Sequence, residues 1–203
     1  SSDSISGNYG TALNEFEIFL ERNQGKWSFG YFGYDLKNEL ERLSTDNTNG
    51  LIAPDLSFFI PEIVISIPFG TKTVILEADN PLSIWNELLN TIEIKEEYPE
   101  KIDKISTRIS KSEYLDKINT LKNHIIEGDL YEVNFCMEFY CEEIDIYPPG
   151  LYLRLNRLSP SPFSAFYKNG NNYILCASPE RFLMKKADKL ISQPIKGTIK
   201  RGT

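Results

Sequence analysis

Apolar residues recur at steps of three and four along several segments of the chain, a spacing that is typical of amphipathic helices. The predicted helices cover residues 11–22, 81–92, 110–128 and 148–158. The third helix has signals at both ends, because Ser110 and Glu113 have the spacing of a capping box and Gly128 follows the last apolar position. The apolar side of the first helix consists of Leu13, Phe16, Phe19 and Leu20.

Elsewhere apolar and polar residues alternate, which predicts half-buried strands. The longest alternating run, residues 129–140, places Tyr131, Val133, Phe135, Met137 and Phe139 on one face of a predicted strand. An Asn169-Gly170 pair between two further runs predicts a hairpin turn. The other predicted strands cover residues 57–67 and 71–79 on either side of a turn at 68–70, residues 163–168 and 173–178, and a pair within 181–195.

These elements predict an α/β (α+β) protein with largely antiparallel sheets flanked by helices. A stretch rich in lysine and glutamate, residues 93–109, separates two parts of the sequence. We therefore expect an N-terminal α/β portion at 1–109 and a second portion at 110–203. Gly30 and Gly33 interrupt an aromatic, strand-like run, and such glycines indicate a close approach of another backbone segment or a bulge.

The composition argues against several classes of protein. Acidic residues outnumber basic ones by 29 to 22, giving a net charge of −7, whereas proteins that bind nucleic acid are ordinarily basic. No run of about 18 apolar residues predicts a membrane span. The only histidine is His124, and the cysteines (Cys136, Cys141 and Cys176) lack paired metal spacing. This inventory argues against a zinc hydrolase, and it favours reduced thiols in a cytoplasmic protein.

Two polar segments near the end of the chain are candidates for chemistry. Lys196 lies between an apolar strand and a Gly-Thr pair, where it is either a solvated turn residue or a reactive amine. A lysine becomes a nucleophile only when burial or neighbouring cations lower its pKa from about 10.4. Glu180 ends a predicted strand beside Arg181, as an ion-pair partner or as a proton donor. His124, near the end of a helix, is interpreted as structural.

Five short segments occur in an order that one enzyme family shares. They are residues 30–36 (GYFGYDL), 127–135 (EGDLYEVNF), 159–163 (SPSPF), 177–182 (ASPERF) and 194–198 (PIKGT). In these segments the chain resembles the chorismate-utilising enzymes, which include component I of aminodeoxychorismate synthase and of anthranilate synthase. The resemblance implies a partial chorismate-utilising-enzyme fold that spans the N-terminal-to-middle part of a longer enzyme.

The resemblance also implies roles for particular residues. Lys196 corresponds to a nucleophile that attacks C2 of chorismate and expels the C4 hydroxyl, and Glu180 to the acid–base group that assists its departure. Gly197 and Thr198 correspond to positions that line the substrate site. Anthranilate synthases carry alanine at the lysine position. The resemblance therefore favours amination at C4 to 4-amino-4-deoxychorismate, in folate (p-aminobenzoate) biosynthesis, with ammonia from a glutaminase subunit.

An effector and a metal are further implications of the resemblance. Pro162, Phe163 and Ser164 correspond to part of a tryptophan pocket, whose other residues belong to an N-terminal segment without a counterpart in this sequence. Magnesium is the implied cofactor, and its glutamate ligands are expected beyond Thr203. No metal ligand is therefore assigned within the chain, and the chain alone is expected not to convert chorismate.

Two alternatives to aminodeoxychorismate synthase remain open from the sequence. The first is anthranilate synthase component I, which would place the nitrogen on a different ring carbon. The second belongs to another class, a non-catalytic module that docks the glutaminase subunit.

Overall fold

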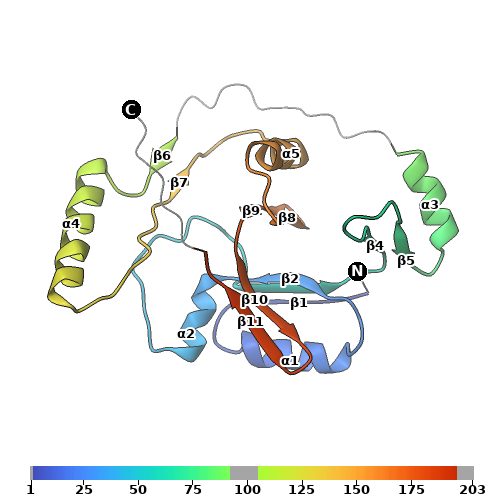
Figure 1. Cartoon of the computed structure of the whole chain (residues 1–203), viewed down its shortest axis with the longest axis horizontal. Helices are drawn as coiled ribbons and strands as arrows, with labels where there is room; N and C mark the ends of the chain where they lie inside the picture. Colours follow the sequence, from blue (N-terminus) through green and yellow to red (C-terminus); the bar gives the residue numbers. More distant parts are fainter. Residues whose placement is uncertain (1, 92–104, 196–203) are drawn as a thin grey trace. The chain divides into compact units, whose positions relative to one another are not determined.

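The computed structural model describes residues 2–91 and 105–195 (Figure 1). The chain divides into two compact units, one made of residues 1–93 with 167–174 and the other of residues 94–166 with 175–203. Each unit combines helices with antiparallel strands, which agrees with the predicted fold class. In the described part of the chain, no helix has both the length and the apolar character that crossing a bilayer requires.

A three-stranded antiparallel sheet forms the centre of the first unit. Its strands lie in the order β1 (Asp3–Gly7), β3 (Leu56–Ile60) and β2 (Phe29–Phe32). Helix α1 (Ala12–Arg22) lies along one face of this sheet (Figure 1). Ala12, Leu36 and Leu56 form the buried cluster between them, and the rings of Phe16 and Phe58 pack against it.

The apolar side of α1 is predicted correctly except at one position. Phe19 is buried and Phe16 is half-buried, but Leu20 is 42% exposed. The part of α1 that packs on the sheet therefore does not include Leu20.

The close approach predicted at the aromatic run is confirmed at both glycines. A Cβ atom on Gly30 would overlap the carbonyl oxygen of Ser57 and the ring of Phe58, because β2 lies directly against β3 there. A Cβ atom on Gly33 would lie 2.9 Å from the carbonyl oxygen of Asp55. After Gly33 the chain continues into the short helices η1 (Tyr34–Leu36) and α2 (Lys37–Leu40).

A carboxylate from α2 caps the N-terminus of α1. Glu39 accepts hydrogen bonds from the backbone N–H groups of Gly10 (2.7 Å), Ala12 (2.9 Å) and Leu13 (3.1 Å). Desolvation raises the pKa of this carboxyl group, but the three donors together outweigh it and hold the pKa below its ordinary value of 4.5. Glu39 therefore satisfies N–H groups that have no partner inside the helix.

The opposite face of the sheet contacts the end of a hairpin that is distant in sequence. The side-chain amide of Asn169 donates to the hydroxyl of the buried Ser57 at 3.0 Å, and the hydroxyl of Tyr167 lies 3.0 Å from the same oxygen. The ring of Tyr167 also packs edge-on against Tyr31. These contacts explain why residues 167–174 belong to the first unit.

The predicted strand at 57–67 is two strands in the structure. β3 ends at Ile60, before Pro61, and the chain resumes as β4 (Val64–Ser66), which pairs with β5 (Ile75–Glu77). Proline lacks a backbone N–H group and therefore ends the pairing. Helix α3 (Pro81–Leu89) begins with Pro81, as predicted, but none of its residues is buried.

Most of the elements predicted after residue 105 are confirmed. Helix α4 (Lys111–Glu127) has the complete capping box of Ser110 and Glu113, and Gly128 ends it in the left-handed conformation. The hairpin turn falls one position later than predicted, at Gly170 and Asn171. The remaining elements are β6 (Ser106–Thr107), β7 (Phe139–Tyr140), α5 (Pro148–Leu158), β8 (Phe163–Asn169), β9 (Asn172–Ser178), β10 (Arg181–Lys186) and β11 (Lys189–Gln193).

The long strand predicted at 129–140 is wrong over most of its length. Only Phe139 and Tyr140 form a ladder, with β6, and within the described residues no strand pairs with 129–138. Val133 and Phe135 line a hollow beside α4, and the Phe135 ring packs against Tyr114. Tyr131 and Phe139, from the same predicted face, are 93% and 63% exposed, so the alternation does not correspond to one buried face in the described residues. A strand also requires a partner strand, which periodicity cannot specify.

Candidate active site

The open end of the β10–β11 hairpin brings together the segments to which the sequence assigns chemistry. Arg181 is paired with Gln193 at this end, whereas Lys186 is paired with Lys189 beside the turn. Glu180 directly precedes the Arg181–Gln193 pair on one strand, and Pro194 directly follows it on the other. The antiparallel register therefore places Glu180 and Pro194 at the same end of the hairpin.

The Glu180 side chain is exposed and forms no hydrogen bond or ion pair with any residue that the structure describes. Its backbone is held by Ser178, whose hydroxyl accepts from the Glu180 N–H at 3.3 Å and donates to the Glu180 carbonyl oxygen at 3.2 Å. The ion pair with Arg181, one of the two alternatives from the sequence, is not formed.

Arg181 contacts neutral groups instead. Its Nε donates to the Oε1 of Gln193 at 2.9 Å, and its Nη1 lies 3.5 Å from the Sδ of Met184. Its Cζ lies 4.7 Å from the centroid of the Phe163 ring, a distance typical of cation–π contacts. One half-buried guanidinium therefore joins the beginnings of β8 and β10 and the end of β11.

The residues implied for a tryptophan pocket lie at the start of β8. Phe163 is half-buried beneath the Arg181 guanidinium, and its carbonyl oxygen lies 3.9 Å from the thiol of Cys176. The Ser164 hydroxyl donates to the carbonyl oxygen of Ser161 at 2.9 Å, whereas Pro162 is exposed. Their binding of tryptophan stays a prediction. Lys196, Gly197 and Thr198 lie outside the described residues.

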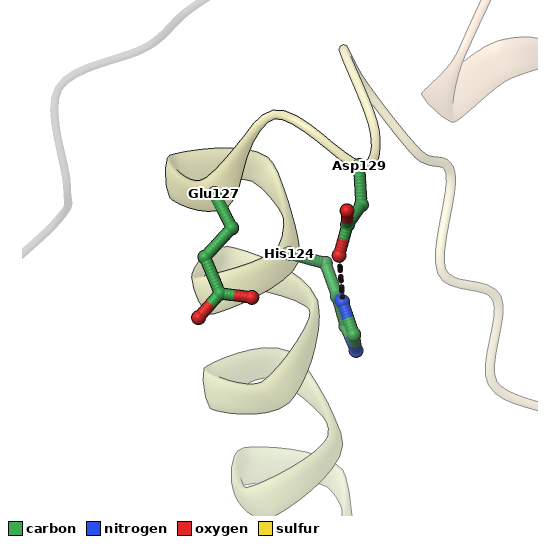
Figure 2. Close-up of side chains that lie close together, drawn as sticks. All are labelled: His124, Glu127 and Asp129. Carbon is green, nitrogen blue, oxygen red and sulfur yellow. Dashed lines mark hydrogen bonds and ion pairs between the residues drawn. The ribbon is translucent and has the colours of Figure 1, made fainter.

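The magnesium site implied by the resemblance stays a prediction, which the part of the chain that the structure describes does not test. The one group of potential metal ligands found there is His124, Glu127 and Asp129, all exposed, at the end of α4 (Figure 2). The Nδ1 of His124 is hydrogen-bonded to the Oδ2 of Asp129 at 2.8 Å. Magnesium prefers oxygen ligands in octahedral geometry, which a histidine-containing surface group does not provide. His124 and Glu127 belong to the last turn of α4, and Asp129 directly follows its C-cap, Gly128.

Sequence reasoning missed the role of Arg181 and of Gln193. It treated Arg181 as a partner of Glu180, because the two are adjacent in sequence. Counting residue pairs outward from the hairpin turn places Arg181 near the end of β11, and therefore near Gln193. The register shift that makes them partners is not visible in the residue pattern.

Comparisons with known proteins identify relatives for most of the chain. The family model described as "chorismate binding enzyme" matches residues 7–203. Aminodeoxychorismate synthase component 1 of Escherichia coli is 28% identical over 176 residues, covering 86% of this chain and 38% of the relative. Anthranilate synthase component 1 of Buchnera aphidicola is 31% identical over 189 residues, covering 85% of this chain and 36% of the relative. The chain thus spans well under half the length of these relatives.

The fold has a solved counterpart. The crystal structure of anthranilate synthase component I from Streptococcus pneumoniae superposes with a TM-score of 0.69 at 20% identity, covering 82% of this chain and 41% of the other. At this identity the likeness shows the fold alone, and it agrees with the partial fold expected from the sequence motifs. Together with the family match over residues 7–203, it shows that the chain belongs to the family of chorismate-binding enzymes.

Proposed function

We propose that this chain is part of a component I of aminodeoxychorismate synthase, which aminates chorismate at C4. The observation that carries this choice is Lys196 within PIKGT, since the anthranilate-forming members of the family have alanine there. Curated relatives of both kinds match the chain at similar identity, so overall similarity does not discriminate between the two reactions. The residue at position 196 does.

The proposed chemistry needs a nucleophile and a proton donor. The amine of Lys196 forms a bond to C2 of chorismate while the C4–O bond breaks, and Glu180 protonates the departing hydroxyl, which leaves as water. Hydroxide is a poor leaving group, so this proton transfer lowers the barrier. Ammonia then forms the C4–N bond as the C2–N bond breaks, which regenerates Lys196 and gives 4-amino-4-deoxychorismate.

The architecture of the hairpin supports this assignment. Glu180 lies next to the Arg181–Gln193 pair, and Lys196 follows Gln193 by three positions in the sequence. The two proposed catalytic residues thus belong to chain segments that leave the same end of one hairpin. The carboxylate of Glu180 is exposed and contacts no other described residue, which leaves it accessible from the described side of the hairpin end.

The rest of the proposal concerns the longer protein. A glutaminase subunit would supply ammonia, in agreement with the name "component 1" of the relatives. Magnesium is proposed as the cofactor, with ligands outside the described residues, where it would bind and polarise the substrate. Gly197 and Thr198 are proposed to line the chorismate site, and a cytoplasmic location would suit the three free cysteines.

Product analysis tests the reaction directly. The longer protein is incubated with chorismate, magnesium and ¹⁵N-labelled ammonia, and the ring carbon that carries nitrogen is identified by NMR. Nitrogen at C4 is expected, and Lys196→Ala should abolish its incorporation. Nitrogen at C2 would instead support the anthranilate synthase alternative. If the protein consumes no chorismate but binds a glutaminase subunit, the result would support the docking module.

A further inference from the structure

The open end of the β10–β11 hairpin contains a β-bulge. Continued without interruption from the Lys186–Lys189 pair, the register would place Pro194 opposite Arg181, but Gln193 occupies that position. The shift lies between Arg181 and Met184, and the Ser192 hydroxyl donates to the carbonyl oxygen of Phe182 across it at 3.0 Å. Proline cannot donate a hydrogen bond to a strand ladder. The bulge places Gln193, whose side chain Arg181 can bind, opposite Arg181 in place of Pro194.

Arg181 is a charged group whose described partners are all neutral. Its contacts are the amide oxygen of Gln193, the sulfur of Met184 and the ring of Phe163. Glu180, adjacent in sequence and exposed, is not among them. The described partners of Arg181 therefore belong to the start of β8, to β10 itself and to the end of β11, and they hold the residue that directly follows Glu180.

We propose that Arg181 is a positioning residue, which binds Gln193 and Phe163 and thereby fixes Glu180 relative to the segment that leads to Lys196. This inference rests on the proposed function, because it concerns the two residues assigned to that chemistry. The guanidinium acts through geometry: it donates from Nε in the plane of the group while its face covers the Phe163 ring. A lysine side chain has no planar group with which to reproduce this combined geometry, so lysine is not an equivalent residue here.

The test compares variants of the longer protein that alter this contact in different ways. Arg181→Lys keeps the charge, Gln193→Leu removes the acceptor, and Gln193→Glu supplies a carboxylate acceptor in its place. With saturating ammonia, Arg181→Lys and Gln193→Leu should each lower kcat by between ten- and a hundredfold, roughly the cost of misplacing a catalytic group, with KM for chorismate little changed. Gln193→Glu should retain most of the activity.

Two further measurements separate positioning from general destabilisation. The double variant should be no worse than the poorer single variant, because both remove one contact. Amide hydrogen exchange should increase at residues 180–182 and 192–195 and stay unchanged beside the turn at Lys186 and Lys189. Lys186→Gln and Lys189→Leu, at the far end of the same hairpin, serve as matched controls and should leave kcat and exchange at the open end unchanged.

Different results would overturn the positioning role of Arg181 and the proposed amination at C4. Full activity in Arg181→Lys, additive losses in the double variant, or unchanged exchange at the open end would each overturn the positioning role. Nitrogen at C2 in the wild-type product would overturn the proposed C4 reaction alone. In that case the kcat ratios still decide the role of Arg181, because Glu180 would serve the anthranilate-forming reaction as well.

Discussion

At the scale of single residues, Gly30 shows how closely two strands can be packed when one side chain is missing. A methyl group there would overlap the backbone of Ser57, which cannot move without disturbing the centre of the sheet. Gly30→Ala should therefore reduce the free energy of unfolding by about 1–3 kcal/mol, as overpacking commonly does. Denaturant unfolding checks this value. Gly7→Ala is the matched control, because its Cβ would have ordinary contacts at 3.8 Å and should change stability by less than about 0.5 kcal/mol.

Glu39 provides a prediction about pH. Its folded-state pKa lies below 4.5 because three backbone N–H donors outweigh the effect of desolvation. A lowered pKa gives stability that is present above the unfolded-state value and is lost as the pH falls through the folded-state value. We expect Glu39→Gln to lower Tm at pH 7, and the difference from wild type to shrink below about pH 4.5. A difference that persists unchanged into acid would contradict this, and Glu41→Gln serves as a control on the same turn.

At the scale of elements, α4 depends on a local cap. The Ser110 hydroxyl accepts from the Glu113 N–H at 3.2 Å, and the Glu113 carboxylate accepts from the Ser110 N–H at 2.8 Å. Ser110→Ala should cost about 1 kcal/mol of stability, a typical value for a lost N-cap, as measured by denaturant unfolding. Thr120→Ala removes a hydroxyl that donates back to the Asp116 carbonyl oxygen, and it should be nearly neutral. Equal losses in the two variants would contradict the specific role of the cap.

The same helix shows which elements can be predicted from sequence. Both ends of α4 were predicted because each signal acts on nearby backbone: Ser110 and Glu113 bond each other across three residues, and Gly128 ends the helix that directly precedes it. The β10–β11 hairpin was predicted for the same reason. Glu39 as a cap for α1 was not, because it acts across 26 to 29 residues. The strand at 129–140 failed because pairing requires a partner that periodicity does not identify. At the site, sequence pointed to Glu180 correctly as a residue near a strand end, but not to the Arg181–Gln193 contact.

At the scale of the whole molecule, the chain is much shorter than the enzymes whose activity we propose for it. The chain covers 38% of the Escherichia coli relative, yet it contains Glu180 and Lys196, both assigned to catalysis. Catalytic groups and metal ligands need not lie in the same portion of a chain, because a fold brings distant segments together. The proposal therefore separates into two parts, a hairpin that carries acid–base and nucleophilic groups, and a metal site outside the described residues.

This separation predicts how residues 1–203 behave when expressed alone. Calorimetric titration with chorismate should show no magnesium-dependent binding, whereas in the longer protein the removal of magnesium with EDTA should weaken chorismate binding. The physical reason is that the one group of three potential ligands found in the described residues contains His124 and is exposed, which suits magnesium poorly. Far-UV circular dichroism establishes first that the isolated chain is folded. Tight magnesium-dependent binding by residues 1–203 would place the metal site within them, and its loss in Glu127→Gln would assign it to the end of α4.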